Sequence, residues 1–223
     1  MSNLIINGEG PIAAALVARL EAQACDVRTL RLPKGPDDTD DLRAHFESFA
    51  ASGGRYANIH IDLTEGFDEI AEFEADADAA RIALEHRLKA LLKALKYGAQ
   101  HMARADGGRI WVLCYDHSVS FSVTAPSNPV TNYAAIAAVQ CVAKEVAHLD
   151  VKVNLFMIHP PVETVEAREW RQARDSLHVY RLKYKPQSAD QVSELLQMYA
   201  GLTHLSTTGG VIPVGSGIAV CNI

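Results

Sequence analysis

Cysteines are scarce in this sequence, and they are scattered. Cys25, Cys114, Cys141 and Cys221 lie far apart, and no CxxC or Cys/His spacing typical of a zinc site occurs. We interpret them as small, mostly structural thiols of a reducing cytoplasm, and we expect no metal site.

An excess of basic residues is also lacking, as are long hydrophobic runs. The formal net charge of −6 argues against a large basic surface for nucleic acid or anionic lipid. No stretch approaches the roughly 20 apolar residues of a membrane span, and the N-terminus lacks the pattern of a signal peptide. The sequence therefore predicts a cytoplasmic protein with neither nucleic-acid nor membrane partners.

What the sequence does contain is typical of one globular domain over residues 1–223. Hydrophobic residues make up 48% and charged residues 22%, which is enough for a full core. Apolar runs predict strands at 3–7, 26–32, 56–63, 109–115, 151–158 and within 209–217; helical spacing predicts helices at 12–24, 41–52, 76–104, 129–148 and 188–202. This alternation predicts an α/β fold with a Rossmann-type, doubly wound parallel sheet covered on both faces.

The turn after the first strand carries a loose dinucleotide fingerprint. Gly8, Gly10 and Ala13 follow the GxGxx[G/A] spacing between a strand and a helix. Glycines at such a turn let the backbone approach a pyrophosphate at the helix N-terminus. These three residues are the candidate cofactor-binding residues.

Three neighbouring residues count against this site. Pro11 removes one N–H from the helix start, and Glu9 places a carboxylate where phosphates would lie. The second strand ends in Arg31, in place of the acidic residue that holds ribose hydroxyls. Arg31 either favours a 2′-phosphate or is simply solvated, and the second interpretation is the more ordinary one.

Motifs in the later part of the chain resemble the short-chain dehydrogenase/reductase superfamily. "HMARADGGRIWVL", "VAKEVAHLDVKVNLFMIHPPVET" and "GGVIPVGSG" match, in order, the family's G-R-I-V-x-I, A-x-E-x-A…V-x-V-N and T-G-x-x-x-x-V-D-G-G segments. The resemblance covers nearly the whole chain. It implies a Rossmann-type fold and NAD(P)-dependent chemistry at a carbonyl or alcohol, with a catalytic serine, tyrosine and lysine.

Two alignments place the catalytic set differently. If Tyr133 is the family tyrosine, Ser120 takes the serine place and Ala137 replaces the lysine. Loss of the lysine would impair proton transfer by the tyrosine, because a phenol of pKa near 10 needs a nearby cation to act as a base at neutral pH. This alignment also requires two compensating changes of length.

The alignment without gaps is the one that we favour. It places Tyr115 at the serine position, Asn128 at the tyrosine position and Asn132 at the lysine position. Asn128 and Pro129 are then a good N-cap and first residue of the following helix. All three catalytic residues are lost, so no catalytic residue and no bound cofactor are expected in this chain.

Other family positions depart as well. Arg87 lies at or beside the place of the family's helix asparagine, and "DLTEG" at 62–66 replaces the N-N-A-G turn. Pro160-Pro161 replaces the P-G turn, whereas Thr164 keeps the place of a threonine that contacts the nicotinamide. About one βα unit is missing between the second strand and "ANIHIDL", and with it an acidic residue for the adenine.

This coherent loss favours a non-catalytic subunit. Family members assemble through their two long central helices and through their closing helix and strand, and "YAAIAAVQCVAKEVA" is rich in small residues that permit close helix approach. We expect the chain to form oligomers with itself and with an active homologue. Heteromeric dehydrogenases of acyl-CoA-type substrates, such as that of benzylsuccinate degradation, are built in this way.

The alternative is an enzyme with a rebuilt site. The segment 116–127, expected to be a polar loop, follows a central strand and offers Ser118 and Ser120; Tyr115 and Tyr133 flank it. Such a site would support NAD(P)-dependent or non-redox chemistry. Asp116, His117 and Ser118 are adjacent in sequence, which makes a triad an improbable arrangement, and a polar surface loop is the simpler interpretation.

The segment 165–187 occupies the family's substrate-loop region. Trp170, Tyr180 and Tyr184 stand among many Arg and Lys residues and could contact an anionic ligand or a partner. A solvated amphipathic helix is the simpler interpretation.

Overall fold

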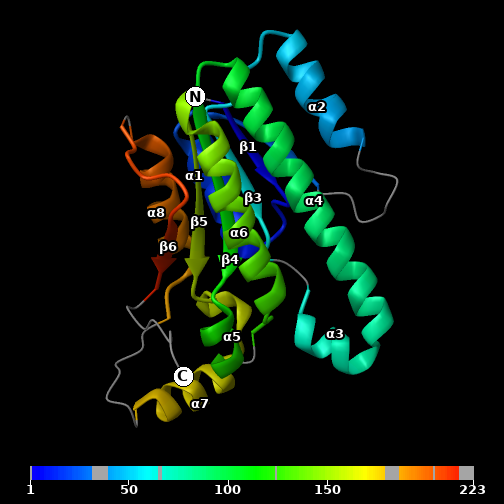
Figure 1. Cartoon of the computed structure of the whole chain (residues 1–223). Helices are drawn as coiled ribbons and strands as arrows, with labels where there is room; N and C mark the ends of the chain where they lie inside the picture. The colour runs from blue at the N-terminus through cyan, green and yellow to red at the C-terminus, as the bar shows by residue number, and fades with distance from the viewer. Residues whose placement is uncertain are drawn as a thin grey trace.

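A computed structural model describes residues 2–31, 40–64, 67–123, 125–178, 186–202 and 204–215. Its strands are β1 (Ser2–Ile6), β2 (Asp26–Leu30), β3 (Asn58–Asp62), β4 (Gly108–Tyr115), β5 (Val151–Ile158) and β6 (Val211–Val214). They form one parallel sheet of order β2-β1-β3-β4-β5-β6 (Figure 1). The α/β, doubly wound prediction is confirmed.

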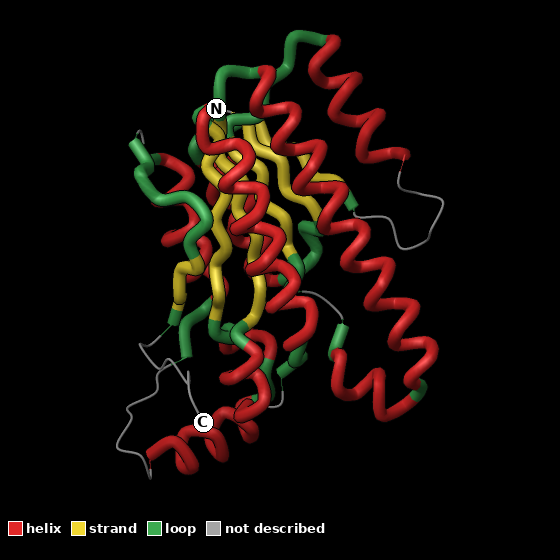
Figure 2. The backbone as a smooth tube through the Cα atoms, viewed as in Figure 1, coloured by secondary structure: helices red, strands yellow, loops and turns green. Residues whose placement is uncertain are grey.

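Helices cover both faces of the sheet. Helices α1 (Pro11–Ala22) and α8 (Ala189–Gly201) pack on one face, and α4 (Ala77–Arg104) and α6 (Pro129–Val146) on the other, with α2 (Asp40–Ala51) against α4. The remaining helices are short: α3 (Glu69–Ala75), α5 (His117–Val123), α7 (Ala167–His178), and the 3-10 turns η1 (Ala147–Leu149) and η2 (Val162–Thr164). Figure 2 shows that α5 and α7 lie beyond the carboxyl ends of the strands.

The central strands are apolar on both faces because each face is covered. In β4, Ile110, Val112 and Cys114 join the core beneath α4 and α6, whereas Trp111 and Leu113 join the core beneath α1 and α8. This alternation decides which side of the sheet each residue near the strand ends can reach. Tyr115, at the end of β4, follows the same alternation and lies on the side of Trp111 and Leu113.

The sheet is short at the β2 edge. In a doubly wound sheet of order 3-2-1-4-5-6, a further strand lies beyond the second strand. Within the described residues β2 is the last strand on this side, and α2 with its connections leads directly to β3. This arrangement agrees with the predicted loss of one βα unit.

The structure contains one short helix that was not predicted, and one predicted loop is wrong. The acidic stretch before the long helix contains a separate helix, α3, which Asp68 caps by accepting hydrogen bonds from the N–H groups of Ile70 and Ala71. The expected polar loop at 116–127 contains α5, and Val119 and Val123 are buried against α7. Both helices have seven residues, too few for a clear 3.6-residue period.

Candidate functional site

The expected ligand crevice lies outside the carboxyl ends of β1 and β3, where the strand order reverses. The chain crosses this point in two turns that hold each other. Asn7, in a left-handed conformation with φ of 65°, donates from its side chain to the carbonyl of Asp62 at 3.3 Å. A side-chain bond therefore bridges the crevice at its base.

The glycine turn is shaped by packing. A Cβ on Gly8 would lie 3.1 Å from Cγ2 of Ile5, so the close neighbour of this glycine is the core of the protein itself. Gly10 caps α1 with extended backbone, and Pro11 occupies the first helical position without an N–H. Ala13 is fully buried beneath the helix.

The two charged residues of this region pair with each other. The guanidinium of Arg31, after β2, forms an ion pair with the carboxylate of Glu9 in the turn. A pyrophosphate would meet this carboxylate and would have to compete for this arginine. The residues present at this turn do not fit a dinucleotide as they stand.

The turn after β3 contains a buried acid. Thr64 donates to Oδ1 of Asp62 from its N–H at 2.8 Å and from its hydroxyl at 2.7 Å, while Oδ2 is buried without a partner. Burial raises the pKa of Asp62 to about 6, although the bonds from Thr64 and the charge of Arg87 act in the opposite direction. Arg87, predicted at the place of the helix asparagine, donates to the carbonyl of Leu63 and so holds this turn.

The three positions of the ungapped alignment meet only in part. Asn132 donates from Nδ2 to the backbone carbonyl of Tyr115 at 2.6 Å. The Tyr115 side chain itself is buried in the core beneath α1 and α8, with Phe156 and Val214. Asn128 is buried at the start of α6, and its Oδ1 has no hydrogen-bond partner.

A carboxylate that sequence reasoning missed holds the start of α6. Glu69 of α3 is only 2% exposed, and it accepts from the N–H groups of Val130 at 2.7 Å and Thr131 at 2.8 Å, and from the Thr131 hydroxyl. The predicted helix start at Asn128 is confirmed, but the Asn128 side chain makes no capping bond. Glu69 takes over the cap across 61 residues of sequence.

The rebuilt-site candidates do not form a triad. The Ser118 hydroxyl donates to Oδ1 of Asp116 at 2.6 Å, which fixes the first turn of α5. His117 instead lies beside Asn132, with 3.2 Å between Nδ1 and Nδ2, and its ring centroid is 5.3 Å from that of Tyr133. Tyr133 is 64% exposed, so this ring pair lies open to solvent.

Ser120 is buried, whereas the ring pair of His117 and Tyr133 is open to solvent. Ser120 is fully buried on α5, and its hydroxyl has no hydrogen-bond partner. Its helix packs on α7 through Val119, Val123 and Trp170. Ser120 and Tyr133, paired in the gapped alignment, share no hydrogen bond in the described part of the chain.

The remaining candidates serve local structure. The Thr164 hydroxyl donates to the carbonyl of Pro161 at 2.7 Å inside η2. Trp170 is 7% exposed and packs with Val119 and Val123, as expected of the apolar side of an amphipathic helix; Tyr180 and Tyr184 lie outside the described residues. No group of three potential metal ligands occurs among the described residues, and none of their helices is long and apolar enough to cross a membrane.

Comparison with known proteins identifies the fold to which the chain is similar. No family profile matches the sequence, and no curated protein matches it. A short-chain dehydrogenase/reductase from Mycobacterium ulcerans superposes with a TM-score of 0.77 at 18% identity, covering 97% of this chain and 88% of the other. The chain has the short-chain dehydrogenase/reductase fold.

Two further structures agree. Levodione reductase superposes with a TM-score of 0.74 at 13% identity, covering 97% of this chain and 96% of the other. A small-chain dehydrogenase in complex with NADPH gives a TM-score of 0.65 at 18% identity, with 97% of each chain covered. At these identities the likeness shows the fold.

Proposed function

We propose that this chain is a non-catalytic member of the short-chain dehydrogenase/reductase family that serves as a subunit beside an active homologue. One observation carries the proposal: the aligned catalytic positions hold asparagines in place of the tyrosine and lysine, and Asn132 and the first N–H groups of α6 are engaged in internal bonds. Asn132 is bonded to a backbone carbonyl, and Glu69 occupies the first N–H groups of α6. Neither asparagine supplies the phenol or the cation that the family's proton transfer needs.

The glycine turn supports the same proposal. An NAD(P) pyrophosphate would need to approach N–H groups at the start of α1, where Pro11 has none and Glu9 carries a negative charge. Arg31 is the residue that would contact a 2′-phosphate, but Glu9 neutralises it. We infer that the chain binds NAD(P) weakly or not at all.

The surface supports assembly through α4 and α6. Large apolar side chains are exposed on both helices: Leu92 is 54% exposed and Tyr133 is 64% exposed. Ala137 is exposed one turn beyond Tyr133, so a partner helix can approach closely. An active homologue on this face would supply the NAD(P)-dependent step, on a hydroxyacyl or oxoacyl thioester in the arrangement that we favour.

Affinity purification of the chain from its native host tests the proposal. We expect a second, intact short-chain dehydrogenase to co-purify in stoichiometric amount, and we expect carbonyl reductase activity only with that subunit present. A homo-oligomer that reduces a carbonyl substrate by itself would contradict the proposal.

NADPH titration separates cofactor binding from assembly. We expect the wild-type protein not to quench NADPH fluorescence at micromolar concentrations, whereas Glu9→Gln, which frees Arg31, gains severalfold affinity for NADPH over NADH. Glu21→Gln, an exposed acid on α1, is the matched control. Tight NADPH binding by the wild-type protein would favour an enzyme.

A rebuilt enzyme is the second candidate, and the His117–Tyr133 pair is the observation that favours it. An imidazole beside an exposed phenol at the carboxyl edge of the sheet can exchange a proton with a bound substrate. If this candidate is correct, His117→Ala and Tyr133→Phe each abolish an activity of the purified chain that Ser118→Ala leaves intact.

A further inference from the structure

A groove between α2 and the C-terminal half of α4 lies far from the site described above. Its volume is about 470 Å³, and the turn at residues 53–55 closes one end. Because α4 ends at Arg104, just before β4 begins at Gly108, the groove lies toward the amino ends of the strands. Figure 1 shows α2 at the end of the molecule opposite α5 and α7.

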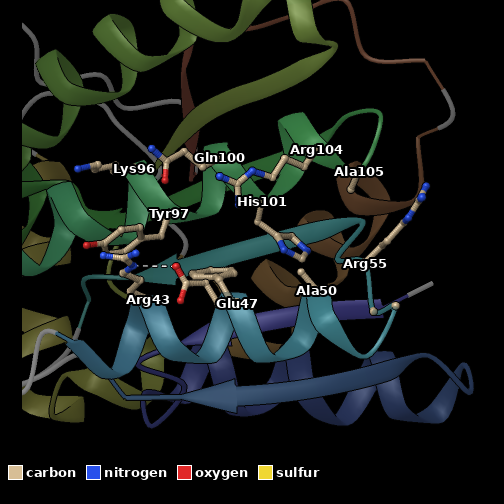
Figure 3. Close-up of a pocket in the computed structure, with 13 residues that line it drawn as sticks. Arg43, Glu47, Ala50, Arg55, Lys96, Tyr97, Gln100, His101, Arg104 and Ala105 are labelled. Carbon is tan, nitrogen blue, oxygen red and sulfur yellow. Dashed lines mark hydrogen bonds and ion pairs between the residues drawn. The ribbon is translucent and has the colours of Figure 1, made fainter.

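Cations converge on this groove. Arg43 of α2, Arg55 of the turn, and Lys96 and Arg104 of α4 line it, and Glu47 is the single acid among the lining residues that the structure describes. Four positive charges and one negative charge give +3 for these described lining residues, within a chain whose net charge is −6. Figure 3 shows the α2 and α4 side chains on opposite walls, with Arg55 at the end opposite Lys96.

Two of these cations have no acidic partner in the part of the chain that the structure describes. Arg43 pairs with Glu47 at 2.7 Å and Arg55 with Asp106 at 3.5 Å, whereas Lys96 and Arg104 form no ion pair with any described residue. Burial, together with electrostatic repulsion from His45 and Arg104, lowers the pKa of His101, which also lines the groove. Two of the four cations at the groove, Lys96 and Arg104, are therefore left without an acidic partner among the described residues.

Helix ends do not account for this charge. A helix C-terminus attracts cations through a partial charge of about half a unit, within its last turn only. This effect covers Arg104 in the last turn of α4. It does not cover Lys96, two turns earlier, or Arg43, which lies near the positive, N-terminal end of α2.

The size and walls of the groove narrow the class of ligand. About 470 Å³ lies within the usual range of small-molecule sites. Arg side chains bind phosphate oxygens with paired hydrogen bonds, and the Tyr97 ring, 5.7 Å from Nζ of Lys96, offers a flat apolar wall. The overall acidic charge disfavours a long nucleic acid.

We propose that this groove binds a small organic phosphate, a molecule with a phosphate or diphosphate group on an aromatic body. Arg43, Lys96 and Arg104 contact the phosphate oxygens, and Tyr97 packs against the body of the ligand. Nothing in this assignment depends on whether the chain is catalytic.

Isothermal titration at low salt with three probes tests the assignment. We expect ADP to bind most tightly, inorganic pyrophosphate more weakly, and adenosine not at all. Lys96→Gln/Arg104→Gln should weaken ADP binding by roughly tenfold or more. Arg81→Gln/Lys89→Gln removes the same charge from exposed positions of the same helix and should leave binding unchanged.

Hydrogen exchange on the wild-type protein gives a readout that needs no variant. ADP should increase protection within residues 43–55 and 96–105. Absence of binding by ADP and pyrophosphate at millimolar concentration would overturn the proposal. So would equal losses in the two double variants, which indicate general charge attraction, or ADP binding that survives in Lys96→Gln/Arg104→Gln, which places it elsewhere. Equal affinity for ADP and pyrophosphate would overturn the role of Tyr97.

Discussion

Two buried ionisable residues on one strand oppose each other in their response to pH. His60 and Asp62 lie two residues apart on β3 and are both fully buried. Burial lowers the pKa of His60 to about 3 and raises the pKa of Asp62 to about 6. Burial therefore disfavours the charged form of each residue, and neither ring nitrogen of His60 has a hydrogen-bond partner among the described residues.

Replacing His60 should reduce the loss of folding stability that occurs as the pH falls. The unfolded chain protonates this histidine below about pH 6.5, whereas the folded chain does so only near pH 3, so stability falls as the pH drops between these values. Between pH 7 and 5 we expect wild-type protein to lose about 2 kcal/mol more than His60→Leu does. Urea denaturation at both pH values measures this difference, with exposed His148→Leu as the control. Equal pH dependence of the wild type and His60→Leu would contradict it.

Replacing Asp62 should reduce the loss of folding stability that occurs as the pH rises. The folded chain keeps Asp62 protonated up to about pH 6, whereas the unfolded chain loses the proton near pH 4, so stability falls as the pH rises between these values. From pH 5 to 7 we expect the wild type to lose roughly 1 kcal/mol more than Asp62→Asn. The same denaturation series measures it, and a difference of the opposite sign would show that Asp62 is ionised in the folded protein.

At the scale of elements, the short helices decide what the carboxyl edge of the sheet can do. Helix α3 places Glu69 beneath the start of α6, and its Asp68 accepts from the N–H of Ser127 at 3.3 Å. Helix α5 buries Ser120 and rests on α7. These contacts hold the segment 125–131, in which the ungapped alignment places the tyrosine position at Asn128.

Removal of the Glu69 carboxylate should destabilise this edge. Glu69→Ala leaves the N–H of Thr131, on a buried residue, without its acceptor, and we expect a loss of about 2 kcal/mol in the free energy of unfolding. Glu72→Ala, an exposed acid on the same helix, should change it by less than about 0.5 kcal/mol. Hydrogen exchange should rise at residues 130–133 in Glu69→Ala alone. A uniform rise over the whole chain would instead indicate global unfolding.

At the scale of the whole molecule, exposed apolar side chains lie on both sides of the sheet. The exposed side chains Leu92 and Tyr133 lie on the neighbouring helices α4 and α6, whereas Met198, 56% exposed, lies on α8 across the sheet. Figure 1 shows α4 and α6 side by side on one face. The two faces can therefore be tested separately.

Charged substitutions should distinguish the faces. We expect Leu92→Glu/Tyr133→Glu to disrupt the oligomer, because a carboxylate in a close helix contact loses its hydration without a partner. Size-exclusion chromatography with native mass spectrometry provides the measurement. Ala44→Glu on α2 should leave the oligomer intact. Disruption by Met198→Glu alone would assign assembly to α8.

The sequence by itself determined the fold, because its main strands and helices carry strong local signals. Continuous apolar runs predicted β3, β4 and β5, and helical spacing from residue 188 predicted α8, where Ser188 and Gln191 form a capping box. Asn128 and Pro129 likewise predicted where α6 begins. Such signals are local, since each element needs its own periodicity and end residues.

Only the tertiary structure decided the site. The cap of α6 comes from Glu69, 61 residues before Val130, and no local pattern encodes that pairing. The direction of Tyr115 depends on strand parity and on which helices cover each face, so an aligned position did not place its side chain near Asn132. The groove of cations likewise exists only because α2 packs on α4 and brings Arg43 opposite Lys96 and Arg104. Long-range packing, which joins residues distant in sequence, determines these arrangements.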